Sequence, residues 1–168
     1  MKKLTLLLAF GLLLSTGVMA QRIASVDVAL ILEKLPEYQE AQTALDQQAA
    51  TWKREIDEEY DKIKQAYNKF QADQVLLSPE QKKAREDEII AMETAARQKQ
   101  RKRFGPEGDL FQKRQQLVRP IQDRVYEAIE SYANDRGYDF IFDASGSAGI
   151  IFNNQQYDKT DDILSRLD

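Results

Sequence analysis

Carboxylates are the side chains of this 168-residue chain with the widest choice of chemistry, because it has 28 Asp and Glu residues but no His and no Cys. The lack of His and Cys excludes most zinc, copper, haem and iron–sulfur ligation, and also the Ser–His and Cys–His pairs of nucleophilic catalysis. Two carboxylates could still hydrolyse a glycan as acid and base. Such a pair needs a rigid concave site, whereas most carboxylates here fall on solvated helical faces. We therefore expect no enzyme, no metal and no cofactor.

The most conspicuous charged stretch is the basic run RQKQRKR. Its cationic members are Arg97, Lys99, Arg101, Lys102 and Arg103. One interpretation is a basic patch that attracts an acidic partner. The other is that the run faces the acidic stretch EIDEEYD, residues 55–61, on a neighbouring helix, where opposite charges set register and solubility. The second interpretation is favoured, and the run is kept as the candidate contact surface for a binding partner.

The first 20 residues have the pattern of a secretory signal peptide. Two lysines follow Met1, and an apolar run extends from Leu4 to Val18. This run is shorter than the roughly 20 residues that span a bilayer, and small side chains precede Gln21, which predicts cleavage after Ala20. Removing Lys2 and Lys3 leaves 22 basic against 28 acidic side chains, a net charge of −6. An acidic, exported, soluble protein follows, which argues against general nucleic-acid binding.

A long helical hairpin is predicted downstream of Pro36. Apolar or small residues recur there at an average spacing of 3.56 residues, which places them on one helical stripe. The stripe is Tyr38, Ala41, Leu45, Ala49, Trp52, Ile56, Tyr60, Ile63, Tyr67 and Phe70. The sequence SPEQ, residues 78–81, then predicts a tight turn and a new helix through a Ser cap, a first-turn proline and a capping box.

The return arm should run from Pro79 to about Arg136. Facing residue numbers then sum to roughly 154 near the tip, which places Lys99 near Glu55 and Arg97 near Asp57. The return arm has 11 residues more than the outgoing arm, and this surplus must leave the helix at one place. The stretch GPEG, with Gly105, Pro106 and Gly108, is the expected place. A hinge and a fixed bulge are both compatible with this sequence.

Three short strands are expected at the root of the hairpin. The first is Arg22–Val28, and the others carry Phe140 with Phe142 and Ile150 with Phe152 on one face each. Such a sheet is too small to bury its apolar face alone, and closure around a symmetry axis is the economical remedy. The expected shared core of a trimer is Val26, Phe140, Phe142, Ile150 and Phe152. Alternatively, the root of the hairpin covers the sheet in a monomer.

The expected fold is thus mainly α with a small β body. A long antiparallel helical prong, residues 37–119, would be rooted in a three-stranded sheet within a body formed by residues 21–36 and 120–168. Residues 21–168 would form one domain. A short final helix starting at Thr160, with Ile163, Leu164 and Leu167, would dock on the body.

This order of elements behind a signal peptide resembles the Skp/OmpH family of periplasmic chaperones for outer-membrane proteins. The stretch FGPEGDLFQKRQQLVRPIQDRVYEAI, residues 104–129, is similar to the branch of the family in Bacteroidetes-type bacteria. The resemblance implies a periplasmic homotrimer whose prongs enclose unfolded outer-membrane proteins, the clients, without ATP. The best-known members are strongly basic. The acidic charge of this chain departs from them, which speaks against lipopolysaccharide or membrane contact.

Two other functions were weighed. A structural or tethering coiled coil of the envelope would have a stripe dense in Leu and Ile, whereas Ala, Tyr and polar residues interrupt this one. A glycan hydrolase would need a carboxylate pair in a cleft, and no such pair can be located in the sequence. The preferred hypothesis is an ATP-independent holdase, which keeps clients from aggregating.

Overall fold

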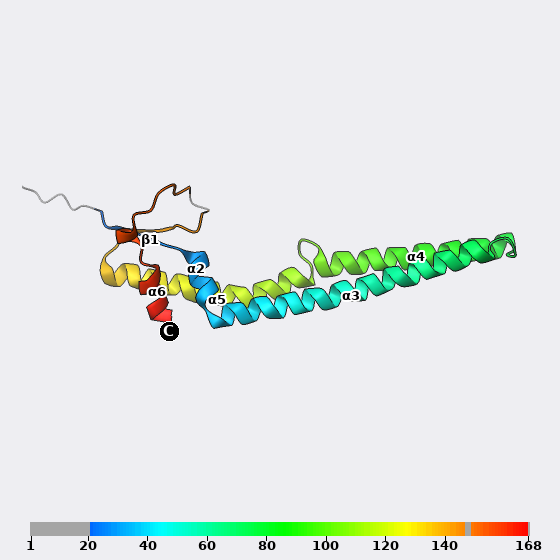
Figure 1. Ribbon diagram of the computed structural model, residues 1–168, viewed down its shortest axis with the longest axis horizontal. Helices are drawn as coiled ribbons and strands as arrows, with labels where there is room; N and C mark the ends of the chain where they lie inside the picture. Colours follow the sequence, from blue (N-terminus) through cyan, green and yellow to red (C-terminus); the bar gives the residue numbers. More distant parts are fainter. Residues whose placement is uncertain (1–20, 147–148, 168) are drawn as a thin grey trace, which may run out of the picture.

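The computed structural model describes residues 21–146 and 149–167. A small body lies at one end of the molecule, and a long two-arm prong extends from it (Figure 1). The predicted signal peptide, with its cleavage site after Ala20, lies outside the described residues.

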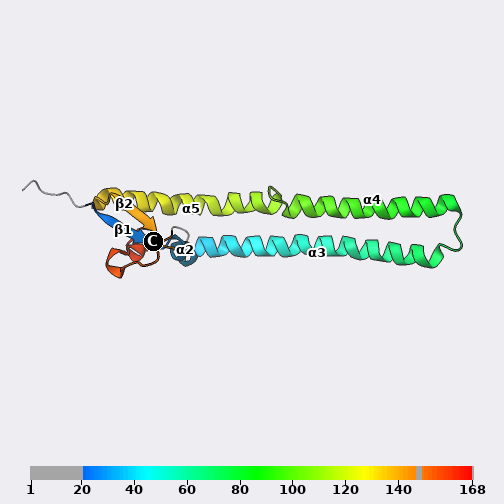
Figure 2. The same cartoon turned by 90° about the horizontal axis from the view of Figure 1, so that it is seen from above.

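The prong is an antiparallel helical hairpin. Its outgoing arm is α3, Pro36–Asp73, and its return arm consists of α4, Pro79–Phe104, and α5, Asp109–Arg136. The two arms lie side by side along their length in both views (Figures 1 and 2). A separate short helix, α2 at Val28–Lys34, precedes the prong, and Pro36 begins α3 where a proline costs no helical hydrogen bond.

The tip of the prong is the predicted capping box. The Ser78 hydroxyl accepts from the Gln81 backbone N–H, and the Gln81 side chain accepts from the Ser78 N–H. These two bonds satisfy donors that the first turn of a helix leaves without a partner. The turn between the arms is therefore fixed by local chemistry.

The predicted stripe forms a thin core between the arms. Near the tip, Ile63 and Phe70 pack against Ile89 and Ala96, and nearer the body Ala41 and Leu45 pack against Val118. Tyr60 and Tyr67 of the stripe are exposed. The facing residue numbers sum to 154 and 158 at the contacts of Lys99 with Glu55 and Glu59, and to 161 at the Arg124–Glu37 ion pair, so the sum rises towards the body. Residues 105–108, four of the expected surplus of 11, lie outside the helices between Phe104 and Asp109.

The body contains two parallel strands. β1, Ile23–Val26, pairs with β2, Phe140–Asp143, with Ile23 opposite Phe140 and Val26 opposite Asp143. Parallel neighbours need a long crossover connection. The whole prong supplies this connection, and the strand that precedes the prong is the partner of the strand that follows it.

Two expectations for the strands need correction. The first strand ends at Val26 rather than Val28, because the Asp27 carboxylate accepts from the Leu30 N–H and caps α2. Residues 149–154, around Ile150 and Phe152, form no strand within the single chain. The free edge of β1 is used instead by Asp158, which forms a parallel bridge with Ser25.

The core of the body covers only one face of the sheet. Val26 packs with Ile31, Val125 and Ile163, from α2, α5 and the final helix α6, Thr160–Leu167. Ile163 and Val125 are fully buried. Within the single chain Val26 is buried, apart from Phe140 and Phe142, whose rings are exposed, and a core shared between copies stays a prediction. The separation follows from the alternation of side chains along paired strands.

Tyr132 makes the body sensitive to alkaline pH. Burial raises the pKa of Tyr132 from 10.0 to about 12, and the Asp162 carboxylate, which accepts a hydrogen bond from the Tyr132 hydroxyl at 2.7 Å, is the next cause. A pKa that is higher in the folded state means that folding favours the neutral phenol over the phenolate. The stability that the neutral Tyr132 side chain contributes is therefore complete below pH 10 and is lost as pH rises towards 12. We expect the urea midpoint of the parent to fall more over this range than that of Tyr132→Phe, measured by circular dichroism. Equal losses in both proteins would contradict the assignment.

Candidate functional site

The helix break at residues 105–108 is tightly built. The Gly105 N–H donates to the Arg101 carbonyl at 2.8 Å, and the Gly108 N–H donates to the Gly105 carbonyl at 2.9 Å. A Cβ on Gly105 would lie 2.4 Å from the Arg101 carbonyl oxygen, and one on Gly108 would lie 2.7 Å from that of Lys102. Neither glycine has a positive φ. Glycine is therefore required at both positions because the backbone approaches itself closely, and not because of an unusual backbone conformation.

Arg103 ties the break to both arms. Its guanidinium lies 4.6 Å from the centre of the Trp52 ring on α3 and pairs with Asp109, the first residue of α5, at 2.5 Å. The Trp52 ring in turn meets the Phe104 ring edge-on, with centroids 6.4 Å apart. A cation stacked on an aromatic face and paired with a carboxylate holds its position firmly. The end of α4 and the start of α5 are thus fixed against the outgoing arm.

The basic run divides into paired and unpaired members. Lys99 lies 3.7 Å from Glu55 and 3.5 Å from Glu59, as the facing acidic stretch predicts. Arg97 forms an ion pair with Glu93, one turn away on its own helix, rather than with Asp57. Arg101 and Lys102 are exposed.

Arg101 and Lys102 form no ion pair with any residue that the structure describes. They border an open hollow beside the break, together with Gln98 of α4 and Gln112 of α5. Within the run, these two cations are therefore the ones free to attract an acidic partner. The interpretation that the run faces the acidic stretch of α3 is confirmed for Lys99. The interpretation as a basic patch is left with Arg101 and Lys102.

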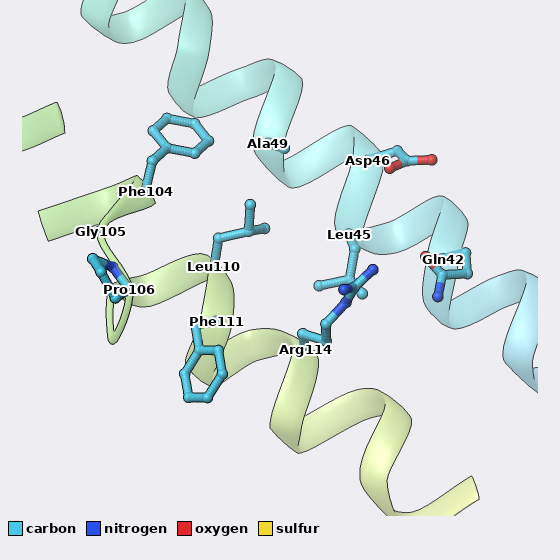
Figure 3. Close-up of a pocket in the computed structure, with 10 residues that line it drawn as sticks. All are labelled: Gln42, Leu45, Asp46, Ala49, Phe104, Gly105, Pro106, Leu110, Phe111 and Arg114. Atoms are coloured by element: carbon cyan, nitrogen blue, oxygen red, sulfur yellow. The ribbon is translucent and has the colours of Figure 1, made fainter. Parts of the chain in front are cut away.

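A pocket of about 350 Å³ opens between the break and α3 (Figure 3). Its apolar lining comprises Leu45, Ala49, Phe104, Pro106, Leu110 and Phe111. Gln42, Asp46 and Arg114 supply its polar side chains. Leu110 points towards α3, whereas the Phe111 ring lies on the side of α5 that faces away from α3 (Figure 3). The sequence reasoning missed this pocket, although two phenylalanines flanking GPEG could have indicated it.

A further exposed apolar surface lies on the sheet of the body. The rings of Phe140 and Phe142 stack with centroids 6.2 Å apart and are 50% and 45% exposed. Phe152 is 80% exposed, and with Phe142 and Ile23 it lines a second pocket of about 370 Å³. The structure thus brings together four of the five expected trimer-core residues, Phe140, Phe142, Ile150 and Phe152, on or next to one uncovered face, and separates Val26 from them.

Residues 21–146 and 149–167 contain neither a candidate metal site nor a helix that could span a membrane. In these ranges no group of three or more Asp and Glu side chains is arranged to hold a metal ion. None of the helices there combines the length and the apolar character that crossing a bilayer requires.

Comparison with known proteins places the chain. The family described as outer membrane protein (OmpH-like) matches residues 22–167. The chaperone protein Skp of Yersinia enterocolitica is 26% identical, over 99% of each chain. Among solved structures, an OmpH-like outer membrane chaperone of Caulobacter crescentus CB15 matches with a TM-score of 0.71 at 12% identity, covering 90% of this chain and 86% of the other. This chain, a strand pair connected by a long helical prong, belongs to the OmpH-like family.

Proposed function

We propose that this protein is an ATP-independent periplasmic chaperone that holds unfolded outer-membrane proteins between helical prongs. The observation that carries the proposal is the long two-helix prong with a body at its root, in a chain of the OmpH-like family. The relatives named Skp and OmpH-like chaperone support it. A prong with so thin a core and so few apolar anchors suits a clamp on a disordered chain better than a rigid strut.

A holdase has to suppress aggregation without nucleotide. We expect an equimolar amount of the mature protein to lower light scattering several-fold when a urea-unfolded, acidic β-barrel protein is diluted into buffer. An unrelated acidic protein of similar size is the control for crowding and charge. Scattering equal to that control would favour the alternative function, a tether or structural coiled coil of the envelope.

The unpaired members of the basic run sharpen this experiment. Reversing Arg101 and Lys102 together to Glu should weaken capture of the acidic client several-fold at low salt and leave helicity unchanged, because both side chains are exposed. Lys99→Glu is the matched variant, which places a third carboxylate beside Glu55 and Glu59 and should lower the melting temperature of the prong. Capture at the parental level by the double variant would exclude Arg101 and Lys102 as client contacts.

We also propose that the body closes into a homotrimer through the uncovered sheet face. Phe140, Phe142 and Phe152 are large apolar side chains that a soluble monomer rarely leaves grouped in water. In addition, β2 has β1 as its sole strand partner among the described elements, which leaves one edge for another copy. Added strands from neighbouring copies, including residues 149–154, would complete the small sheet. Three copies is the number that the family resemblance implies.

Phe142→Asp tests this assembly. Burying one large apolar side chain at the interface stabilises the assembly by roughly 1.5 to 3 kcal/mol. Aspartate at this position loses that stabilisation and places a charge from each copy in the interface, so the trimer should dissociate. Because Phe142 is half exposed in the single chain, the variant should remain a helical monomer. Tyr67→Asp, at an exposed position on the prong, is the control and should keep the parental mass in multi-angle light scattering. A monomeric parent would refute the trimer.

Movement at Gly105, Pro106 and Gly108 stays a prediction. The close backbone approaches at both glycines mean that alanine would distort the break rather than stiffen it. Spin labels on Gln98→Cys and Gln112→Cys, on opposite sides of the break, give a clean readout because the chain has no cysteine of its own. A hinge should give label distances that differ between small and large clients. One narrow distance that is the same without client and with either client would establish a fixed bulge.

A further inference from the structure

The pocket at the helix break is preformed. The backbone hydrogen bonds of Gly105 and Gly108 hold the loop, and the Arg103–Asp109 pair holds both flanking helices. Leu45 at the base of the pocket is only 5% exposed, whereas Phe104 and Phe111 are 40% and 45% exposed. Aromatic walls around an unfilled hollow are available to a ligand, and a fixed shape reduces the entropy lost on binding.

The charges at the pocket indicate which apolar group it accepts. Arg114 and Asp46 both line it, and the two form no ion pair with each other or with any residue that the structure describes. An Arg without a carboxylate partner beside aromatic walls can contact the face of an incoming ring, and rings also pair edge-on with Phe side chains. An aliphatic side chain would gain only from burial. The lining therefore favours an aromatic group over an aliphatic one.

The size and place of the pocket point to a side chain of a client. Its volume of about 350 Å³ is at the small end of the roughly 300–1,000 Å³ of small-molecule sites, which suits a single ring. Membrane β-barrel strands alternate apolar with polar residues and carry aromatic girdles. An extended strand that places one ring in the pocket directs its neighbours away into water.

We propose that the pocket formed by α3, the break and α5 binds an aromatic side chain of an unfolded client. This inference rests on the proposed chaperone function and adds to it a defined anchor point halfway along each prong. It also gives the break a role that is independent of movement, because the four residues between α4 and α5 interrupt the helix and create a hollow that an uninterrupted helix would lack.

Two labelled peptides of 12 residues test this anchor, one alternating Phe with Ser and one alternating Leu with Ser, each with the same terminal aspartates. We expect fluorescence anisotropy to show tighter binding of the Phe peptide by the parent. Phe111→Ala should weaken binding of the Phe peptide about tenfold, and Ala49→Leu, which fills the pocket from α3, should do the same. Tyr67→Ala removes an aromatic side chain of similar exposure elsewhere on the prong and should bind as the parent does.

Trp52 locates the bound peptide, because it is the single tryptophan of the chain and its ring contacts Phe104 in the pocket wall. Its emission should shift with the Phe peptide in the parent and not in Ala49→Leu. Equal binding of both peptides, or parental affinity in both pocket variants, would overturn the inference. If the parent suppresses client aggregation in either of these cases, the chaperone function stands and the anchor alone is wrong. A parent that fails to suppress aggregation refutes the function itself.

Discussion

The parallel pairing of β1 with β2 is the constraint on which the rest of the molecule depends. Parallel strands cannot be joined by a tight turn, so the chain must travel away and return between Val26 and Phe140. Here the connection is extended into a prong that is much longer than the strands require. The backbone bonds of the strand pair, together with the packing of α2, α5 and α6, fix both roots of the prong at one place.

The prong itself has little cohesion of its own. Each contact layer consists of a few side chains, such as Ile63 with Ile89 or Leu45 with Val118, and the remaining surface of both arms is exposed. Ion pairs such as Lys99 with Glu55 and Glu59 add little stability at the surface, but they set the register. A long exposed surface with a thin core is a poor scaffold for catalysis and a suitable one for many weak contacts with a disordered chain.

The break in the return arm takes up part of the difference in length between the arms and also forms a pocket. A difference in length between the arms has to be taken up where glycine permits the backbone to approach itself, and Gly105 with Gly108 does this. The aromatic residues on either side then lie against α3 without filling the space. Exposed apolar side chains line the pocket at the helix break and the uncovered face of the sheet, and others, such as Val75 and Leu76, lie at the tip of the prong.

Local signals in the sequence determined the hairpin. The stripe through Ile56 and Ile63, the capping box at Ser78 and the GPEG break each depend on residues close together in the chain, and each is found where the sequence predicts it. The family resemblance was also readable from this order of elements. The facing charges were predictable at Lys99, because the turn fixes the register nearby.

Tertiary structure alone decided the body and the pocket. Which face of β1 and β2 is buried depends on α5 and α6, whose residues Val125 and Ile163 are about a hundred residues or more from Val26, and this packing buries Val26 and leaves Phe140 and Phe142 exposed. The expected third strand failed within the chain, because Asp158 rather than Ile150 reaches the free edge of β1. The pocket joins residues of α3 with residues beyond the break, whose meeting depends on how many residues leave the helix. Sequence periodicity specifies what is local, but contacts across long separations depend on packing that no single segment encodes.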